Sequence, residues 1–225
     1  VEGTRIIVFY PDGGVSKVQK AQMVTQVGKN VCICAVRGNF DDAQTGVKNT
    51  FAACEDPAVL EGKGVRLSSA NSINIGRLAP QVVYYFKAYA DLVKSGRIKL
   101  GEKVDYVVPT GNFGDILAGY FAKYLGLPVG TLVCASNAND VLTDFIHTGC
   151  YDRRRPFHKT VSPSMDILVS SNLERLLFLL SDCNAELVAS YMKQLKEEGI
   201  YQITGEMLER LQSEFWAGCC NDAGT

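Results

Sequence analysis

The sequence has no long hydrophobic run and no excess of charge of either sign. Its apolar stretches, such as Leu176 to Leu180, are far below the roughly 18 residues that cross a bilayer, so we expect no membrane partner. Lysine and arginine total 23 against 24 aspartate and glutamate residues, which gives a net charge of −1. A chain this close to neutral lacks the basic footprint of a nucleic-acid binder, so we expect no nucleic-acid partner.

Patterns that bind metals are also missing. The two histidines, His147 and His158, have no metal-like partner in the sequence, and no C-x-x-C pair occurs among the eight cysteines. We therefore predict no metal site. Eight cysteines in 225 residues do not make a disulfide scaffold, which favours a reduced, cytoplasmic setting. Cys32 and Cys34 alternate with apolar residues, so we expect them on one face of a buried strand.

Strand and helix patterns alternate along the chain. The first 64 residues predict a small βαβα lobe with parallel strands, from strands at 5–10 and 31–36 and helices at 16–28 and 39–54, followed by a polar connector at 55–64. Residues 65–225 predict part of a larger α/β domain. Its expected elements are a helix at 77–94 that includes Pro80, a strand at 105–109, a helix ending at 123, a strand at 131–135, and then helices only, at 139–147, 172–180, 185–196 and 205–215.

The sharpest local motif is Gly111-Asn112-Phe113-Gly114-Asp115, between a predicted buried strand and a predicted helix. A helix start presents unpaired N–H groups and partial positive charge, and glycines let the backbone close on an anion. The carboxyl end of a parallel strand is also where open α/β sheets place ligands. The motif matches neither the P-loop nor the dinucleotide fingerprint. A phosphate cradle and a simple tight connection both remain open on these residues alone.

A second polar run, Ser68 to Asn74, is followed by Arg77. Its hydroxyls and amides, with the guanidinium fork, could satisfy a substrate with several oxygens. A helix start with redundant capping explains the same residues. The basic run Arg153 to Arg155 with Lys159 could attract a phosphorylated substrate, but a solvated loop is favoured. We expect Trp216 to be a packing residue.

Five segments in order carry a family resemblance: 11–16 (PDGGVS), 38–42 (GNFDD), 71–74 (NSIN), 109–115 (PTGNFGD) and 162–167 (SPSMDI). Together they resemble threonine synthase in its longer bacterial and fungal form. The resemblance implies an α/β chain with three-layer αβα parallel-sheet lobes, the fold type II (tryptophan synthase β-like) architecture of pyridoxal-phosphate enzymes. It also implies conversion of O-phospho-L-homoserine and water to L-threonine and phosphate, with pyridoxal 5′-phosphate as the cofactor.

The resemblance also assigns roles to individual residues. It places the cofactor's phosphate on Gly111, Asn112, Phe113, Gly114 and Asp115. It makes Ser69, Asn71, Ser72 and Asn74 expected substrate contacts, with Arg77 as a weaker one.

One part of the family pattern does not occur in this sequence. None of its lysines lies in the family's H-G-P-T-x-x-F-K-D context, which holds the Schiff-base lysine. We therefore assign no catalytic residue within the chain, expect it to be a central segment of a longer enzyme, and expect no threonine formation by the chain alone. Two alternatives stay open: a related phospho-lyase that eliminates phosphate without adding water, and a non-catalytic phosphate- or nucleotide-binding α/β module.

Overall fold

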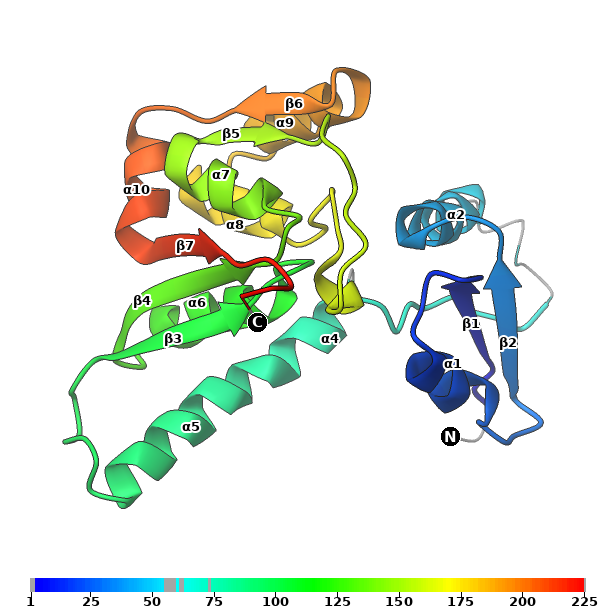
Figure 1. Cartoon of the computed structure of the whole chain (residues 1–225), viewed down its shortest axis with the longest axis horizontal. Helices are drawn as coiled ribbons and strands as arrows, with labels where there is room; N and C mark the ends of the chain where they lie inside the picture. The colour runs from blue at the N-terminus through cyan, green and yellow to red at the C-terminus, as the bar shows by residue number, and fades with distance from the viewer. Residues whose placement is uncertain (1–2, 55–59, 61–62, 73, 225) are drawn as a thin grey trace. The chain divides into compact units, whose positions relative to one another are not determined.

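The computed structural model describes residues 3–54, 60, 63–72 and 74–224, without the side chain of Asp41 (Figure 1). The chain forms two compact units, Val1–Ser68 and Ser69–Thr225. The predicted connector at 55–64 lies mostly outside the described residues, and the predicted domain boundary after residue 64 stays a prediction. No helix in the described part of the chain is both long and apolar enough to cross a membrane.

The first unit has the predicted βαβα order. It contains β1 (Ile6–Pro11), α1 (Lys17–Val24), β2 (Val31–Val36) and α2 (Phe40–Ala53). The two strands are parallel, as predicted, and run in register from Ile6 opposite Val31 to Pro11 opposite Val36. Reciprocal side-chain caps begin both helices, because Ser16 pairs with Gln19 and Asn39 pairs with Asp42.

Two expectations for this unit are wrong. Helix α1 ends at Val24 and not at Gly28, since Thr25 closes it by donating from its hydroxyl to the carbonyl of Ala21 at 2.6 Å. Strand β2 is also not buried. Cys32 is exposed and Cys34 half-buried, although the two do share a face, with their sulfurs 3.7 Å apart. All eight cysteines are free thiols.

The second unit begins with a broken helix rather than the single helix predicted from residue 77. Its parts are α4 (Ile75–Leu78), the 3₁₀ turn η1 (Ala79–Gln81) and α5 (Val82–Lys94). Pro80 lies in the turn. A proline has no N–H to donate, and its ring clashes with the preceding turn, which accounts for the break.

A three-stranded parallel sheet supports the second unit. It contains β3 (Val104–Pro109), β4 (Val129–Ser136) and β7 (Phe215–Cys219), in the spatial order β3-β4-β7. Helix α6 (Gly114–Tyr124) connects the first two strands, as predicted. The α/β class with parallel strands is therefore confirmed.

The expectation of helices only after residue 135 is wrong. Besides β7, a short antiparallel pair forms between β5 (Cys150–Asp152) and β6 (Ile200–Gln202). These strands alternate with α7 (Val141–Thr148), the turn η2 (Pro163–Met165), α8 (Leu173–Leu180), α9 (Ala185–Glu197) and α10 (Glu206–Glu214).

Helices lie on both faces of β7. Successive strand residues point to opposite faces, so Phe215 and Trp216 face opposite layers. Phe215 contacts Tyr120 of α6, with ring centroids 5.6 Å apart, and Trp216 contacts His147 of α7 at 6.3 Å. Only the α6 side is tightly closed, because Phe215 is 2% exposed whereas Trp216 is 57% exposed. We expected Trp216 to be a packing residue. That expectation is wrong, because more than half of its surface is exposed.

Candidate functional site

The Gly111–Asp115 loop follows directly from β3, at the carboxyl end of the parallel sheet. Thr110 fixes this point, because its N–H donates to the carbonyl of Ala135 on β4 at 2.8 Å. Its hydroxyl donates to the carbonyl of Val108 at 2.6 Å. The loop therefore leaves the sheet from an anchored residue and enters α6 at Gly114.

The backbone N–H groups of this loop are unused. Within the described chain, the N–H groups of residues 111 to 116 donate to no acceptor, and the first such bond at the start of α6 runs from Leu117 to the carbonyl of Phe113 at 3.2 Å. Phe113 is left-handed and is followed by the first residues of the helix. This succession turns consecutive N–H groups toward a common concavity, which is a typical anion-binding nest. The loop can therefore offer several donors to one anion.

Phe113 holds an unfavourable backbone conformation. Its φ is 62° and its ψ is 9°, a region that costs a residue with a β-carbon about 1–2 kcal/mol. The ring is 1% exposed and lies 5.6 Å from the ring of Phe215. Burial of a phenylalanine contributes more than this cost, so packing keeps the loop in its conformation.

The two glycines of the motif have different surroundings. A β-carbon at Gly111 would lie 2.7 Å from the carbonyl oxygen of Ser164, so the protein itself requires glycine there. A β-carbon at Gly114 would meet only the side-chain nitrogen of Asn172, at an ordinary 3.5 Å. The space before Gly114 is thus not filled by the protein. Unused donors, the helix start and this space fit the phosphate group of pyridoxal 5′-phosphate.

Asp115 is bonded to Tyr85 of α5. The Tyr85 hydroxyl lies 2.9 Å from the backbone carbonyl of Asp115 and 3.3 Å from its carboxylate. Burial raises the pKa of the Asp115 carboxyl, and the Tyr85 hydrogen bond opposes that rise. Burial is also the main cause that raises the pKa of Tyr85. The Asp115 side chain makes no capping bond at the start of α6 and pairs with Tyr85 instead.

The second candidate group, at residues 69–77, is bonded mainly to itself. Asn74 begins α4 by accepting from the N–H of Gly76 at 2.9 Å, and its amide donates to the carbonyl of Ser69 at 2.6 Å. Asn71 accepts from the N–H of Ser72 at 2.6 Å, and Arg77 donates to the carbonyl of Ala70 at 2.8 Å.

These bonds are those of local capping. Helix α4, which contains Arg77 and is capped by Asn74, packs against α6, the helix that follows the Gly111–Asp115 loop. Ile73 lies outside the described residues. The substrate role of Ser69, Asn71, Ser72, Asn74 and Arg77 stays a prediction.

The sequence analysis missed two residues that hold the loop. Ser170 donates from its hydroxyl to the carbonyl of Gly111 at 3.1 Å. Asn172 donates to the carbonyl of Asn112 twice, from its backbone N–H at 3.1 Å and from its side chain at 2.9 Å. The sequence did contain a signal for them, the run of small polar residues Ser170 to Asn172 before the apolar helix α8. The same run is also typical of an ordinary helix start, so it does not identify a contact with the loop.

The SPSMDI motif is tied to the carboxyl end of β4. Asp166 is 5% exposed, and one of its carboxylate oxygens accepts from Asn137 at 2.7 Å and from the Thr160 hydroxyl at 2.7 Å. This network holds the segment that carries Ser164 against Gly111. The motif therefore supports the Gly111–Asp115 loop through the segment that carries Ser164.

The basic run at 153–155 is paired with neighbouring groups. Arg154 lies 2.9 Å from Asp152, and its hydrogen bonds lower the pKa of that carboxyl to about 2. Arg155 lies 2.7 Å from Asp140 and 2.8 Å from Asp144. Among the described residues, no group of three or more metal-ligating side chains occurs.

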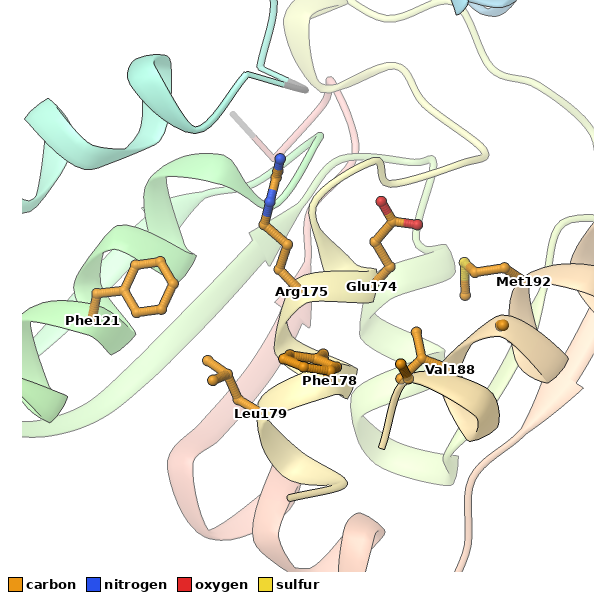
Figure 2. Close-up of a pocket in the computed structure, with 9 residues that line it drawn as sticks. Phe121, Glu174, Arg175, Phe178, Leu179, Val188 and Met192 are labelled. Atoms are coloured by element: carbon orange, nitrogen blue, oxygen red, sulfur yellow. The ribbon is translucent and has the colours of Figure 1, made fainter. Parts of the chain in front are cut away.

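An apolar groove of about 480 Å³ lies between α6, α8 and α9 (Figure 2). Its walls include Phe121, Phe178 and Val188, while Arg175 turns its guanidinium away from these groups. Residues 111–116 do not line it. The groove is thus separate from the phosphate loop.

Comparison with known proteins relates this arrangement to one enzyme. No protein-family model matches the chain. It is 46% identical to human threonine synthase-like 1 over 219 aligned residues. The alignment covers 96% of this chain and 30% of that protein. It is 45% identical to threonine synthase of Pseudomonas aeruginosa over 205 aligned residues. This alignment covers 88% of this chain and 41% of that protein.

A solved structure gives the same result. The crystal structure of pyridoxal-phosphate-bound threonine synthase from Brucella melitensis matches with a TM-score of 0.82 and 43% identity, over 98% of this chain and 45% of that one. This match confirms the predicted fold. The chain spans less than half the length of the proteins it matches. It is therefore homologous to a segment of threonine synthase.

Proposed function

We propose that this chain is the phosphate-anchoring part of a pyridoxal-phosphate-dependent threonine synthase. The full reaction would convert O-phospho-L-homoserine and water to L-threonine and phosphate. The observation that carries the proposal is the set of unused N–H groups at residues 111–116, at the carboxyl end of β3. The pyridoxal-phosphate-bound state of the Brucella melitensis homologue supports the choice of cofactor. The eight free cysteines fit a reducing compartment, which supports a cytoplasmic location.

The residues of this chain would act by binding and positioning. The N–H groups of Asn112, Phe113 and Gly114 would hold the cofactor's phosphate, assisted by the partial positive charge at the start of α6. When bound, pyridoxal 5′-phosphate supplies an electron sink for carbanions next to its imine carbon. Asp115 would contribute its backbone N–H, since its carboxylate is paired with Tyr85.

The residues at 69–77 would contribute to substrate binding from the segment that leads into α4 and from α4 itself. Arg77 offers a guanidinium, of which one nitrogen donates to the carbonyl of Ala70. A guanidinium can donate several hydrogen bonds, so further donors would be left for a phosphate or carboxylate. The Schiff-base lysine of the family is expected outside this sequence, so turnover belongs to the longer protein.

A related phospho-lyase is the second candidate. It stays beside the synthase because the relative named threonine synthase-like 1, which is 46% identical to this chain, carries a name that states likeness to the synthase and no reaction of its own. Both reactions release phosphate, but only the synthase adds water to the carbon chain at the β-carbon. The elimination product of the phospho-lyase takes up water only when its imine hydrolyses to a carbonyl and releases ammonia. Product analysis on the longer protein separates them, because the synthase forms threonine and the phospho-lyase forms a 2-oxo acid.

Binding of pyridoxal 5′-phosphate to the 225-residue chain tests the proposal. We expect saturable binding in equilibrium dialysis, and its loss in Gly114→Trp, because the indole would fill the space before the loop. Gly46→Trp is the matched control, since Gly46 lies within a helix with nothing within 4 Å of its β-carbon position. No binding by the unmodified chain, or a preference for a nucleotide, would contradict the proposal and favour a different phosphate-binding module.

A further inference from the structure

The carbonyl groups of the phosphate loop are held from one side by a single segment. The Ser170 hydroxyl donates to the carbonyl of Gly111, and Asn172 donates to the carbonyl of Asn112 from both its backbone and its side chain. Ser170 is 8% exposed and Asn172 is fully buried. These bonds join two parts of the chain that lie far apart in the sequence.

Fixing a carbonyl also fixes the neighbouring N–H. A trans peptide is planar, so its C=O and N–H point in opposite directions. All described peptide bonds are trans. With the carbonyl of Gly111 turned toward Ser170, the N–H of Asn112 points away from that segment. The same argument turns the N–H of Phe113 away from Asn172, and these are two of the unused donors.

The residues that hold the loop are themselves fixed. The Tyr151 hydroxyl accepts from the N–H of Ser170 at 2.8 Å and donates to the carbonyl of Leu168 at 3.1 Å. Arg175 donates to the side-chain oxygen of Asn172. A guanidinium only donates, so it sets the orientation of the Asn172 amide and leaves the amide nitrogen facing the loop.

We propose that Ser170 and Asn172 are positioning residues that orient the loop's N–H groups toward the cofactor's phosphate. The inference rests on the proposed function, and it adds two residues that act through the carbonyl groups of the loop. Losing the Ser170 hydroxyl would free the carbonyl of Gly111, and losing the Asn172 side chain would leave the carbonyl of Asn112 held by one backbone N–H only. Either loss would let a peptide of the loop rotate, so that its N–H donor is aimed less well.

Asn172→Ala and Ser170→Ala test this in the 225-residue chain. The alanine at 172 removes the side-chain donor to the carbonyl of Asn112 without adding a charge beside the proposed phosphate position. Two probes are compared, pyridoxal 5′-phosphate and pyridoxal, which lacks the phosphate. We expect each variant to lower the affinity for pyridoxal 5′-phosphate about three- to tenfold and to leave pyridoxal binding unchanged. The amide NMR signals of Asn112 and Phe113 should shift in the unliganded variants.

Ser171→Ala is the control, because its buried hydroxyl makes no hydrogen bond in the described chain. Unchanged affinity in both test variants would overturn the inference, as would an equal loss for both probes or an equal loss in Ser171→Ala. If Asn172→Ala fails to fold, Ser170→Ala carries the same test, since it removes one hydroxyl only. Failure of the unmodified chain to prefer pyridoxal 5′-phosphate over pyridoxal would instead contradict the proposed function.

Discussion

At the residue scale, the contact between Tyr85 and Asp115 links α5 to the start of the phosphate loop's helix. Burial raises the pKa of Asp115 above its ordinary value, while the Tyr85 hydrogen bond lowers it. The folded chain therefore binds this proton more tightly than the unfolded chain does. As pH rises from the unfolded pKa through the folded pKa, this carboxyl lowers the free energy of unfolding.

Tyr85→Phe should raise the pKa of Asp115 further, because it removes the bond that favours the charged form. The pH window over which stability falls should then extend to higher pH. Carbon NMR titration of the Asp115 carboxyl measures the pKa, and urea unfolding between about pH 4 and pH 7 measures the stability.

Tyr84→Phe serves as the matched control on the same helix. Tyr84 is 62% exposed, and its hydroxyl has no hydrogen-bond partner in the described residues. We expect this variant to leave the Asp115 titration unchanged. An equal pKa for Asp115 in the unmodified chain and in Tyr85→Phe would show that the hydrogen bond has no electrostatic effect.

At the element scale, strand β7 supports the phosphate loop from the far end of the sequence. It pairs in parallel with β4 and places Phe215 between Phe113 and Tyr120, with both ring centroids 5.6 Å away. The left-handed backbone of Phe113 depends on this packing. Strand β7 therefore stabilises both the sheet and the loop conformation.

Phe215→Ala should lower the free energy of unfolding by about 3–5 kcal/mol, since it leaves a cavity beside Phe113. Trp216→Ala, one residue away on the more exposed face, should cost about 1 kcal/mol or less. Urea unfolding followed by circular dichroism measures both. A similar loss of unfolding free energy in the two variants would mean that packing on the α6 face of β7 is not the main way in which this strand stabilises the second unit.

The sequence predicted elements best where side chains mark their ends. Ser16 and Asn39 form reciprocal caps, and the helices after them begin where expected. Strand β7 was missed because Phe215 follows α10 without a turn residue, so periodicity continued the helix. Strands β5 and β6 have three residues each, too few for an alternating pattern. The break at Pro80 was visible, but a proline in a first turn is also compatible with an unbroken helix.

The candidate site was also predicted only in part, because a local motif is visible in the sequence whereas a contact between distant residues is not. The Gly111–Asp115 loop has a local pattern, and the structure places it at the carboxyl end of β3 as expected. Ser170 and Asn172 act on loop carbonyls that are distant in the sequence, and no local pattern encodes such a bond. The pairing of Asp115 with Tyr85 was also invisible, because it depends on how α5 lies against α6.

At the scale of the whole molecule, the two units differ in how much apolar surface they bury. Tyr10 and Pro11 are the buried apolar residues among the described residues of the first unit, whereas the second unit holds a continuous core around α6, β4 and α8. Apolar burial is the main stabilising contribution in folding. The first unit should therefore be the less stable of the two.

Hydrogen exchange measured by mass spectrometry should show this difference. We expect amides of β1 and β2 to exchange with protection factors well below those of β4, which has a paired strand on each side. Peptides from β3, which has one partner strand in this sheet, provide an internal reference of intermediate protection. Equal protection in β1 and β4 would contradict the expected order of stability.

The late position of β7 along the chain has a consequence for biosynthesis. A ribosome makes Phe113 long before Phe215, so the nascent loop has no Phe215 ring to pack against until β7 emerges. During that interval the left-handed residue is uncompensated, and the loop should sample other conformations. Limited proteolysis of ribosome-bound chains stalled before Phe215 should accordingly cut near Phe113, whereas chains that have released β7 should be protected there.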